Sequence, residues 1–487
     1  MLRLRPLICK LAGCLRRHAL GYPRRRFSGK SLIRNPGTRD WWCLQTLAIE
    51  TSCDDTSVAV LAITGTGDKG SNNALALKTN VLFHERITAD TEGYGGIHPL
   101  VALHSHQRRL APLVLKAVEH LEPCSRPDGK RAPDFVTVTR GPGMRSNLSV
   151  GLDTAKGLAV AWNVPLVGVH HMQAHALTSR LCSTIRLRPQ EAFQSPRDGY
   201  HDAAEWTPQD LEPRFPFLSV LASGGHTMLI ESNSLIEHKI LAETADIAIG
   251  DCLDKTARAI LPPELLVPPY GRALEEFAFP NGASDYHYIP PAGRREELKR
   301  RETRWGWSLA APLSDSHGAA KSSRRMLYSF AGLLTYVQRI MTANPERSID
   351  ERRELAAEVM RVAFEHLASR IMLHLSSLNA EDIETVKTVV LSGGVASNKF
   401  LKHVIRSILD VRNFQHIRLV YPPPELCTDN ALMIAWLGME MYDAGYESEL
   451  GIQPLRKWSM DAAAEDGGIL GVGGWTKRTG SIPDVKL

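Results

Sequence analysis

Residues 170–176 read HHMQAHA and place three histidines within six positions. His171 and His175 are four residues apart, so on a helix both imidazoles would lie on the same face. Histidine is a common ligand of zinc and other transition metals, but a metal site needs three or four protein ligands. Asp429, in the stretch CTDNA, is a candidate third ligand, although Thr428 or Asp429 could equally be the N-cap of a helix.

Other histidines compete with Asp429 for that place, and composition alone does not choose among them. The competing residues are His98, His104, His106 and His226.

The same histidine spacing occurs in zinc peptidases of the HExxH pattern, where a glutamate beside the first histidine acts as general base. Here that neighbour is Met172, and the residues between the two histidines are Met, Gln and Ala. The pair could therefore hold a metal, but it lacks the acidic residue on which the peptidase chemistry depends.

Four glycine or acid-hydroxyl turns could hold an anion, because where glycine is present backbone N–H groups can approach one without an intervening Cβ. Each follows a β-rich run, which together indicates a nucleotide cleft, and none matches the P-loop or GxGxxG pattern. In the first turn, Asp54 and Asp55 are either ordinary turn residues or carboxylates that orient a hydroxyl, a metal-bound water or an attacking amine. The turns are TSCDDTS (51–57), GPGMRSN (141–147), SGGHT (223–227) and SGGVASN (392–398).

The elements around these turns occur in the same order twice. A β-hairpin at 44–63 precedes a strand, glycine turn and helix at 135–162, and a second hairpin at 217–231 precedes the same parts at 385–408. This repeat predicts two α/β lobes that face each other across a cleft, with glycine turns at the strand ends where phosphates are usually held.

Three segments lack a regular pattern. Residues 183–216 are predicted to form an inserted surface loop, and 261–325, rich in proline, glycine and charge, to be mostly loop or disordered insertion. The glycine-rich tail at 461–487 is expected to be loose.

The first forty residues hold eleven Lys or Arg before the first acid, Asp40, with leucine spaced through them. This composition is typical of a mitochondrial transit peptide, although a disordered basic tail would also be basic. Cleavage after Phe27 would remove eight basic residues and change the net charge from +5 to −3. We therefore expect residues 1–40 to be a presequence and linker, and any nucleic-acid binding to use a local patch.

Cysteine spacing and hydropathy exclude other classes of protein. None of the eight cysteines forms a CxxC pair, which argues against a zinc ribbon or disulfide framework and fits a reducing compartment such as the mitochondrial matrix. No apolar run approaches the length needed to cross a bilayer, so no membrane association is expected.

Seven stretches, in order and spacing, resemble the tRNA adenosine threonylcarbamoyltransferase family, the TsaD family, formerly called O-sialoglycoprotein endopeptidase. The resemblance covers residues 44–460 apart from the two insertions, and the basic N-terminus indicates the mitochondrial branch. The stretches are LAIETSCDDTSVAV, HHMQAH, SGGHT, DCLDKTA, YSFAGL, LSGGVASN and CTDNA.

This resemblance implies a duplicated, two-lobe α/β fold of the actin/Hsp70 (ASKHA) type with a nucleotide cleft, its lobes at 44–165 and 166–450. It implies transfer of a threonylcarbamoyl group from threonylcarbamoyl-adenylate, made by a separate synthase, to N6 of the adenosine adjacent to the anticodon in mitochondrial tRNAs that read codons beginning with A. It also implies a homodimer. A metallopeptidase is the alternative that the older name suggests. A kinase or chaperone on the same fold would use the turns but not the histidines.

The resemblance also implies which residues form the site. One divalent metal ion per subunit, zinc or iron, is held by His171, His175 and Asp429, and Asp54 takes part in the chemistry. Leu100 stands where the family has glutamate, and the basic segment 293–304 could contact tRNA phosphates or be a solvated loop. The implied adenylate-binding residues are Leu221, Ala222, Ser223, Gly224, Gly225, Asp254, Gly271 and Asn398.

Overall fold

The computed structural model of the chain describes residues 41–66, 76–94, 96–122, 131–185, 205–314 and 325–478. The presequence predicted at 1–40 lies outside the described residues, as do 186–204, 315–324 and 479–487 within the three unpatterned segments. Within the described ranges, no helix is long and apolar enough to cross a membrane.

The chain forms two mixed sheets, and the first has the strand order β13-β12-β5-β4-β1-β2-β3 in the described residues. β1 and β2 pair antiparallel from end to end, which confirms the first predicted hairpin, and β4 and β5 continue the sheet parallel to β1. Helices α1 and α2 cover one face and α3 and α13 the other, so β4 is buried along its whole length. The strands are β1 (Trp41–Glu50), β2 (Asp55–Thr66), β3 (Ala76–Thr88), β4 (Phe135–Gly141), β5 (Leu166–His170), β12 (Tyr446–Ser448) and β13 (Trp475–Lys477).

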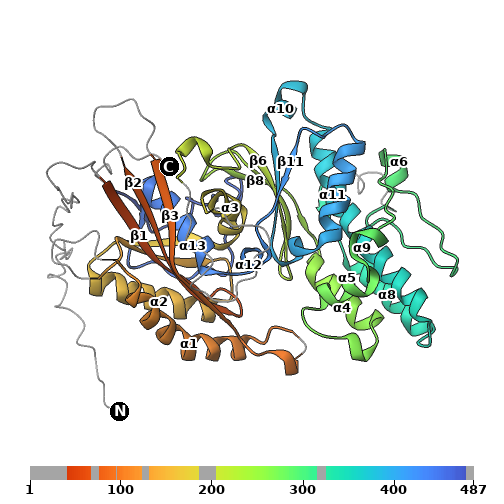
Figure 1. The fold of residues 1–487 in the computed structure, drawn as a ribbon, viewed down its shortest axis with the longest axis horizontal. Helices are drawn as coiled ribbons and strands as arrows, with labels where there is room; N and C mark the ends of the chain where they lie inside the picture. Colours follow the sequence, from red (N-terminus) through yellow and green to blue (C-terminus); the bar gives the residue numbers. More distant parts are fainter. Residues whose placement is uncertain are drawn as a thin grey trace, which may run out of the picture.

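The second sheet repeats this arrangement in the order β11-β10-β6-β7-β8-β9. An antiparallel meander, β6-β7-β8, is followed by β10 and β11, which run parallel to β6; this confirms the second predicted hairpin. Helix α3 contacts β6 and β10 as well as β4 and β5, so it packs between the two sheets, as Figure 1 shows. The strands are β6 (Phe217–Ala222), β7 (Thr227–Ser232), β8 (His238–Thr244), β9 (Leu327–Tyr328), β10 (Thr388–Ser392) and β11 (Arg418–Val420).

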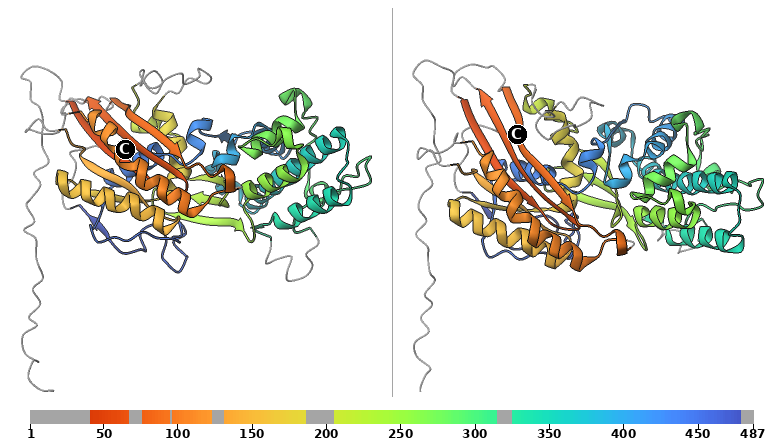
Figure 2. Two further views of the ribbon diagram at one scale, coloured as in Figure 1. Left: turned by 90° about the horizontal axis from the view of Figure 1, so that it is seen from below. Right: turned by 60° about the horizontal axis from the view of Figure 1, so that its bottom comes forward.

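The helices gather into a cluster beside each sheet, which both views of Figure 2 show. The longest described helix, α9, lies in the core of the second cluster together with α4, α5, α8 and α11. The helices are α1 (Pro99–Glu119), α2 (Arg145–Trp162), α3 (His171–Thr184), α4 (Ile249–Ile260), α5 (Tyr270–Ala278), α6 (Arg294–Glu297), α8 (Ala331–Ala343), α9 (Ile349–Leu375), α10 (Ala380–Thr385), α11 (Lys399–Val411), α12 (Pro424–Cys427) and α13 (Ala431–Asp443).

The sheets divide the chain differently from the predicted lobes at 44–165 and 166–450. β5 begins at Leu166 yet belongs to the first sheet, because the strand that follows α2 returns to pair beside β4. β12 and β13 extend the same sheet, so it takes in residues from both sides of the predicted boundary.

Most of 261–314 lies outside helices and strands, as predicted, but it is not a disordered insertion, because Leu274, Phe277 and Trp307 are buried in the second core. The prediction of a loose tail is wrong for the residues described. The tail from 461 to 478 packs against the first sheet, where Ile469 is buried and accepts a hydrogen bond from Trp475 Nε1. Both segments are rich in glycine, proline or charge, but a few spaced apolar side chains anchor each of them.

Candidate metal and adenylate site

Helix α3 begins where β5 ends, and His170 is its N-cap. The Nδ1 atom of His170 accepts a hydrogen bond from Gln173 N, and its Nε2 donates to the Trp458 carbonyl. His170 therefore fixes the start of the helix and is not one of the residues clustered around Asp429. His171 and His175 lie one turn apart on the same helix face, with ring centroids 4.8 Å apart and the rings perpendicular.

Asp429 lies against both rings. Its Oδ1 is 3.4 Å from His171 Nε2 and 3.0 Å from His175 Nε2. The N-cap of α13 is Asn430, whose Oδ1 accepts from Met433 N, so neither Thr428 nor Asp429 fills that role. Within the described ranges these three are the one group of His, Cys, Asp or Glu side chains close enough to share an ion, with ligand atoms within 4.8 Å of one another.

Glu50, which the sequence analysis missed, lies on the other side of His171. It ends β1 with its side chain fully buried, and its Oε2 is 3.3 Å from His171 Nδ1. Burial raises the pKa of Glu50, but the His171 ring lowers it more, to below its ordinary value. A glutamate at the end of the apolar run LAIE was a usable signal, because an acid there must have a buried partner.

The hydrogen-bond pattern tests whether the cluster fits a metal. Because His171 Nδ1 donates to Glu50, the neutral ring presents a lone pair at Nε2, toward an Asp429 oxygen that also carries lone pairs. With Nδ1 as the donor, a cation between Nε2 and the Asp429 oxygen would satisfy both lone pairs. Without a metal the cation is a proton: burial lowers the pKa of His171, but Asp429 and Glu50 raise it to about 10. Two imidazoles and a carboxylate fit zinc or iron and leave a coordination position open.

Asp54 and Asp55 have different surroundings. Asp54 is half-buried in the turn after β1, and burial, followed by the nearby Asp429 carboxylate, raises its pKa above the ordinary value. Asp55 starts β2, accepts a hydrogen bond from Thr88 Oγ1 and lies 3.9 Å from Arg86 Nε. The side chain of Asp55 is thus held by sheet contacts, whereas the side chain of Asp54 makes none of these and lies near Asp429.

The first glycine turn supports the turn of Asp54 instead of presenting an anion site. Met144 N donates to the Ser52 carbonyl, and a Cβ on Gly143 would lie 2.8 Å from that same oxygen. His106 holds the turn from the other side, with Nε2 3.0 Å from the Cys53 carbonyl and Nδ1 2.8 Å from Thr56 Oγ1. His106 therefore has a structural role and is not a metal ligand.

The residues implied in adenylate binding meet in the second half of the fold. Leu221 and Ala222 end β6, and Ser223, Gly224 and Gly225 form the turn to β7. A Cβ on Gly224 or Gly225 would meet nothing within 4 Å, so this backbone is open.

Two other glycines support the underside of this turn. Gly250, at the start of α4, packs so closely on Ser223 that a Cβ would lie 2.7 Å from its carbonyl, and Gly393, with φ of +90°, packs on the Ala222 carbonyl.

The remaining implied residues lie beside one another on α4, α5 and α11. Asp254 Oδ1 accepts from Gly271 N at 3.1 Å, which places Gly271 beside Asp254. Asn398 caps α11 through Leu401 N, while Glu275, missed from sequence, accepts from Lys399 N and Phe400 N at the same helix end. A Cβ on Gly394, in the turn before α11, would lie 3.9 Å from the Thr428 methyl, so this region adjoins the residue before Asp429.

Comparison with known proteins was made on the whole chain. The family model described as TsaD, tRNA N6-adenosine threonylcarbamoyltransferase, matches residues 80–191 and 200–436. The mitochondrial tRNA N6-adenosine threonylcarbamoyltransferase of Schizosaccharomyces pombe is 37% identical over 446 residues, covering 90% of this chain and 91% of its own length. The Brucella anthropi enzyme of that name is 31% identical over 421 residues, which cover 86% and 96%.

These matches span most of the chain, include all three residues of the histidine–aspartate cluster and reach nearly the full length of the relatives. The chain belongs to the tRNA N6-adenosine threonylcarbamoyltransferase (TsaD) family, and to its mitochondrial branch.

Proposed function

We propose that this protein transfers a threonylcarbamoyl group from threonylcarbamoyl-adenylate, supplied by a separate synthase, to N6 of the adenosine adjacent to the anticodon in mitochondrial tRNAs that read codons beginning with A. The observation that carries the proposal is family membership over nearly the full length, in a chain whose His171, His175 and Asp429 converge beside the 392–394 turn. A metallopeptidase is not favoured, because the relatives are named as transferases and Met172 occupies the position of the peptidase base.

Each part of the site has a task in this reaction. A divalent ion held by His171, His175 and Asp429 would supply Lewis-acid polarisation of a carbonyl or phosphate oxygen of the donor. The open backbone at Ser223 to Gly225 would hold the adenylate phosphate, with the N-terminus of α4 directly behind it. Asp254, Gly271 and Asn398 would position the adenosine part of the donor.

Asp54 would orient the attacking amine of the RNA. Its carboxylate lies in the turn nearest the cluster and is not engaged by the sheet contacts that hold Asp55. Because the nucleophile and the leaving group both belong to substrates, the chain must supply orientation more than a strong base. The raised pKa of Asp54 suits a group that briefly shares a proton with the amine.

The wider setting is also part of the proposal. The repeated meander-plus-parallel-strands topology supports a two-lobe fold of the ASKHA type with a nucleotide cleft between its lobes. Exposed Leu115 on α1 and Val160 on α2 offer an apolar surface for a homodimer. The mitochondrial relative and the Arg-rich, acid-free N-terminus support import into the matrix.

A reconstituted reaction tests the proposal. Chain lacking the presequence is incubated with an unmodified mitochondrial tRNA transcript, threonine, bicarbonate, ATP and a threonylcarbamoyl-adenylate synthase, and the nucleosides are analysed by mass spectrometry. We expect threonylcarbamoyladenosine with wild-type protein and little with His171→Ala. Exposed Asp153→Asn is the matched control and should retain activity. Cleavage of a peptide substrate without any tRNA product would refute the proposal.

A further inference from the structure

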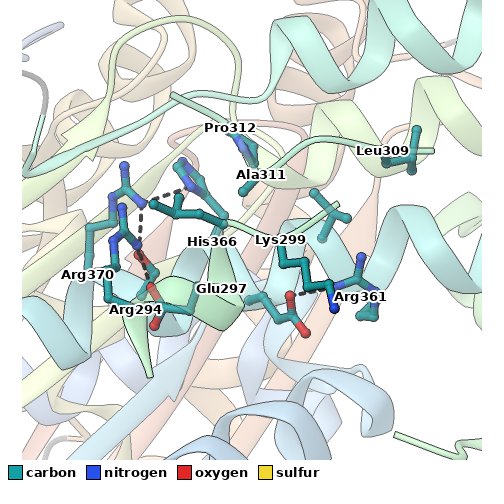
Figure 3. A pocket seen from close by; sticks show the side chains of 13 residues that line it. Arg294, Glu297, Lys299, Leu309, Ala311, Pro312, Arg361, His366 and Arg370 are labelled. Atoms are coloured by element: carbon teal, nitrogen blue, oxygen red, sulfur yellow. Dashed lines mark hydrogen bonds and ion pairs between the residues drawn. The ribbon is translucent and has the colours of Figure 1, made fainter. Parts of the chain in front are cut away.

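A second charged cluster lines a pocket beside α9. Helix α6, the segment 298–312 and one face of α9 enclose it, and it shares no residue with the histidine–aspartate cluster. In Figure 1 the helices α6 and α9 lie at the end of the molecule away from α3. Figure 3 shows Arg294, Arg370 and His366 with their nitrogen atoms toward one another at one end of the pocket.

Cations outnumber carboxylates in the pocket wall. Its charged residues are Arg294, Lys299, Arg361 and Arg370 against Glu297 and Glu365.

Both carboxylates are already engaged. Glu297 binds Arg294 and is 2.8 Å from Arg412 Nη2, while Glu365 binds Arg361 and accepts from Tyr288 Oη. Neither forms an ion pair with Arg370.

Arg370 is the least compensated of these cations. It is 2% exposed and donates to the Leu327 carbonyl and Ser369 Oγ, both neutral groups, and its Nη1 lies 3.0 Å from His366 Nδ1. Within the part of the chain that the structure describes, no carboxylate oxygen comes within 4.0 Å of its guanidinium. Burial lowers its pKa to about 10, so it is still charged at neutral pH. A buried cation without a counter-ion is costly.

The hydrogen bonds of His366 also indicate that an acceptor is missing from this part of the pocket. Ser329 N donates to His366 Nε2 at 3.1 Å, so the neutral ring must carry its proton on Nδ1. That N–H then faces Arg370 Nη1, which is also a donor, at 3.0 Å. Arg294 Nη1 and Arg370 Nη1 both donate to the one hydroxyl of Ser369, at 2.9 and 3.0 Å. Donors in this corner therefore outnumber acceptors.

We propose that this pocket binds a phosphate group, whose oxygens accept hydrogen bonds from Arg370, Arg294 and the Nδ1–H of His366, with Lys299 at the rim. A tetrahedral oxyanion supplies both the missing negative charge and the missing acceptors. The phosphate is either a free anion or a phosphodiester of bound RNA, because Arg294 and Lys299 belong to the exposed basic segment 293–304. The proposal does not depend on the transferase activity.

Calorimetric titration of the full chain with inorganic phosphate, at constant ionic strength, tests the pocket. We expect one millimolar or tighter site in the wild type and at least about tenfold weaker binding in Arg370→Met. Arg294→Gln, at a half-exposed side chain, covers the case in which Arg370→Met does not fold. Exposed Arg339→Met, on the neighbouring helix α8, removes one charge without touching the pocket and should bind as wild type.

A second arm separates the two sources of phosphate. Filter binding of an unmodified tRNA transcript is measured against KCl concentration for wild type, Arg294→Gln and Arg339→Met. If RNA occupies the pocket, Arg294→Gln alone lowers the salt slope by about 0.7–1, and phosphate competes with the transcript. An unchanged slope with lost phosphate binding identifies a free anion. If wild type shows no phosphate heat and Arg294→Gln binds tRNA with wild-type salt dependence, the proposal is wrong.

Discussion

The protein contains two clusters of charged side chains, and they differ in the sign of the ligand that would complete each of them. Around His171, two carboxylates face two imidazoles, and Asp429 Oδ1 lies between the Nε2 atoms of His171 and His175, where we propose a cation. Around Arg370, N–H groups converge and the carboxylates are used elsewhere, so an anion is required. In both cases the contact between two groups of the same hydrogen-bonding kind, more than the net charge, indicates the ligand. The comparison also predicts that each cluster responds to its own changes and not to those of the other, because they share no residue.

The largest effect is expected from Asp429→Ala. It removes the one carboxylate that faces both histidines, so metal affinity should fall by more than about a hundredfold, beyond what loss of a supporting partner causes. Equilibrium dialysis with zinc measures this, with Asp153→Asn as control. Phosphate binding at the Arg370 pocket should be unchanged; a parallel loss there would show that the clusters are coupled.

Two substitutions on α9 compare a buried arginine that has carboxylate partners with one that has none. Arg361 binds Glu358 and Glu365, so Arg361→Met leaves buried Glu365 without that partner and should cost about 3 kcal/mol of unfolding free energy. Arg370→Met removes a cation that has no carboxylate partner, and should cost under about 1 kcal/mol in phosphate-free buffer. Urea unfolding measures both. Equal losses would mean that Arg370 is compensated after all.

Glu50→Gln tests the support of the metal ligands. Glutamine still accepts from His171 Nδ1 but carries no charge, so we expect metal affinity to fall by about tenfold to a hundredfold with the fold intact. Metal titration followed by far-UV circular dichroism separates the two effects. Wild-type affinity in this variant would remove Glu50 from the site.

The smallest effect concerns a histidine with no charged partner. His238 is buried between Ser232 Oγ and the Leu235 carbonyl, and burial lowers its pKa to about 4. The folded chain stays neutral there while the unfolded chain binds a proton below its ordinary pKa. Stability is therefore lost as pH falls from about 6.5 toward 4, by about 1 kcal/mol between pH 7 and 5.5. His238→Gln should lose that much less over the same interval in urea unfolding; an identical pH dependence would contradict the assignment.

Local pattern predicted the elements that carry the site but not how they associate. The two hairpins and the helix of His171 follow from alternation and spacing within a few residues. Asp429 is 254 residues from His175, and nothing local distinguishes it from His106 or His226. Its selection rested on resemblance, and the fold supplies the physical reason: α3 and α13 pack against each other, and the start of α13 meets the histidine face.

The features missed from sequence depend on partners distant in the chain. Glu50 contacts His171 only because α3 lies against the end of β1. The packing of segment 261–314 was not predicted, because composition does not reveal that Phe277 and Trp307 reach the core. The sequence does not distinguish Arg370 from any other helical arginine. Its lack of a carboxylate partner becomes evident only in the structure, where Glu297 binds Arg412.

Metal content tests most directly whether the converging lone pairs hold a cation. The full chain, Asp429→Ala and Arg370→Met are purified without chelator after growth with zinc and iron, and metal per chain is measured by inductively coupled plasma mass spectrometry. We predict one divalent ion per chain in wild type and Arg370→Met, and less than about a tenth of that in Asp429→Ala. Equal metal in all three proteins, or none in the wild type, would contradict the metal site.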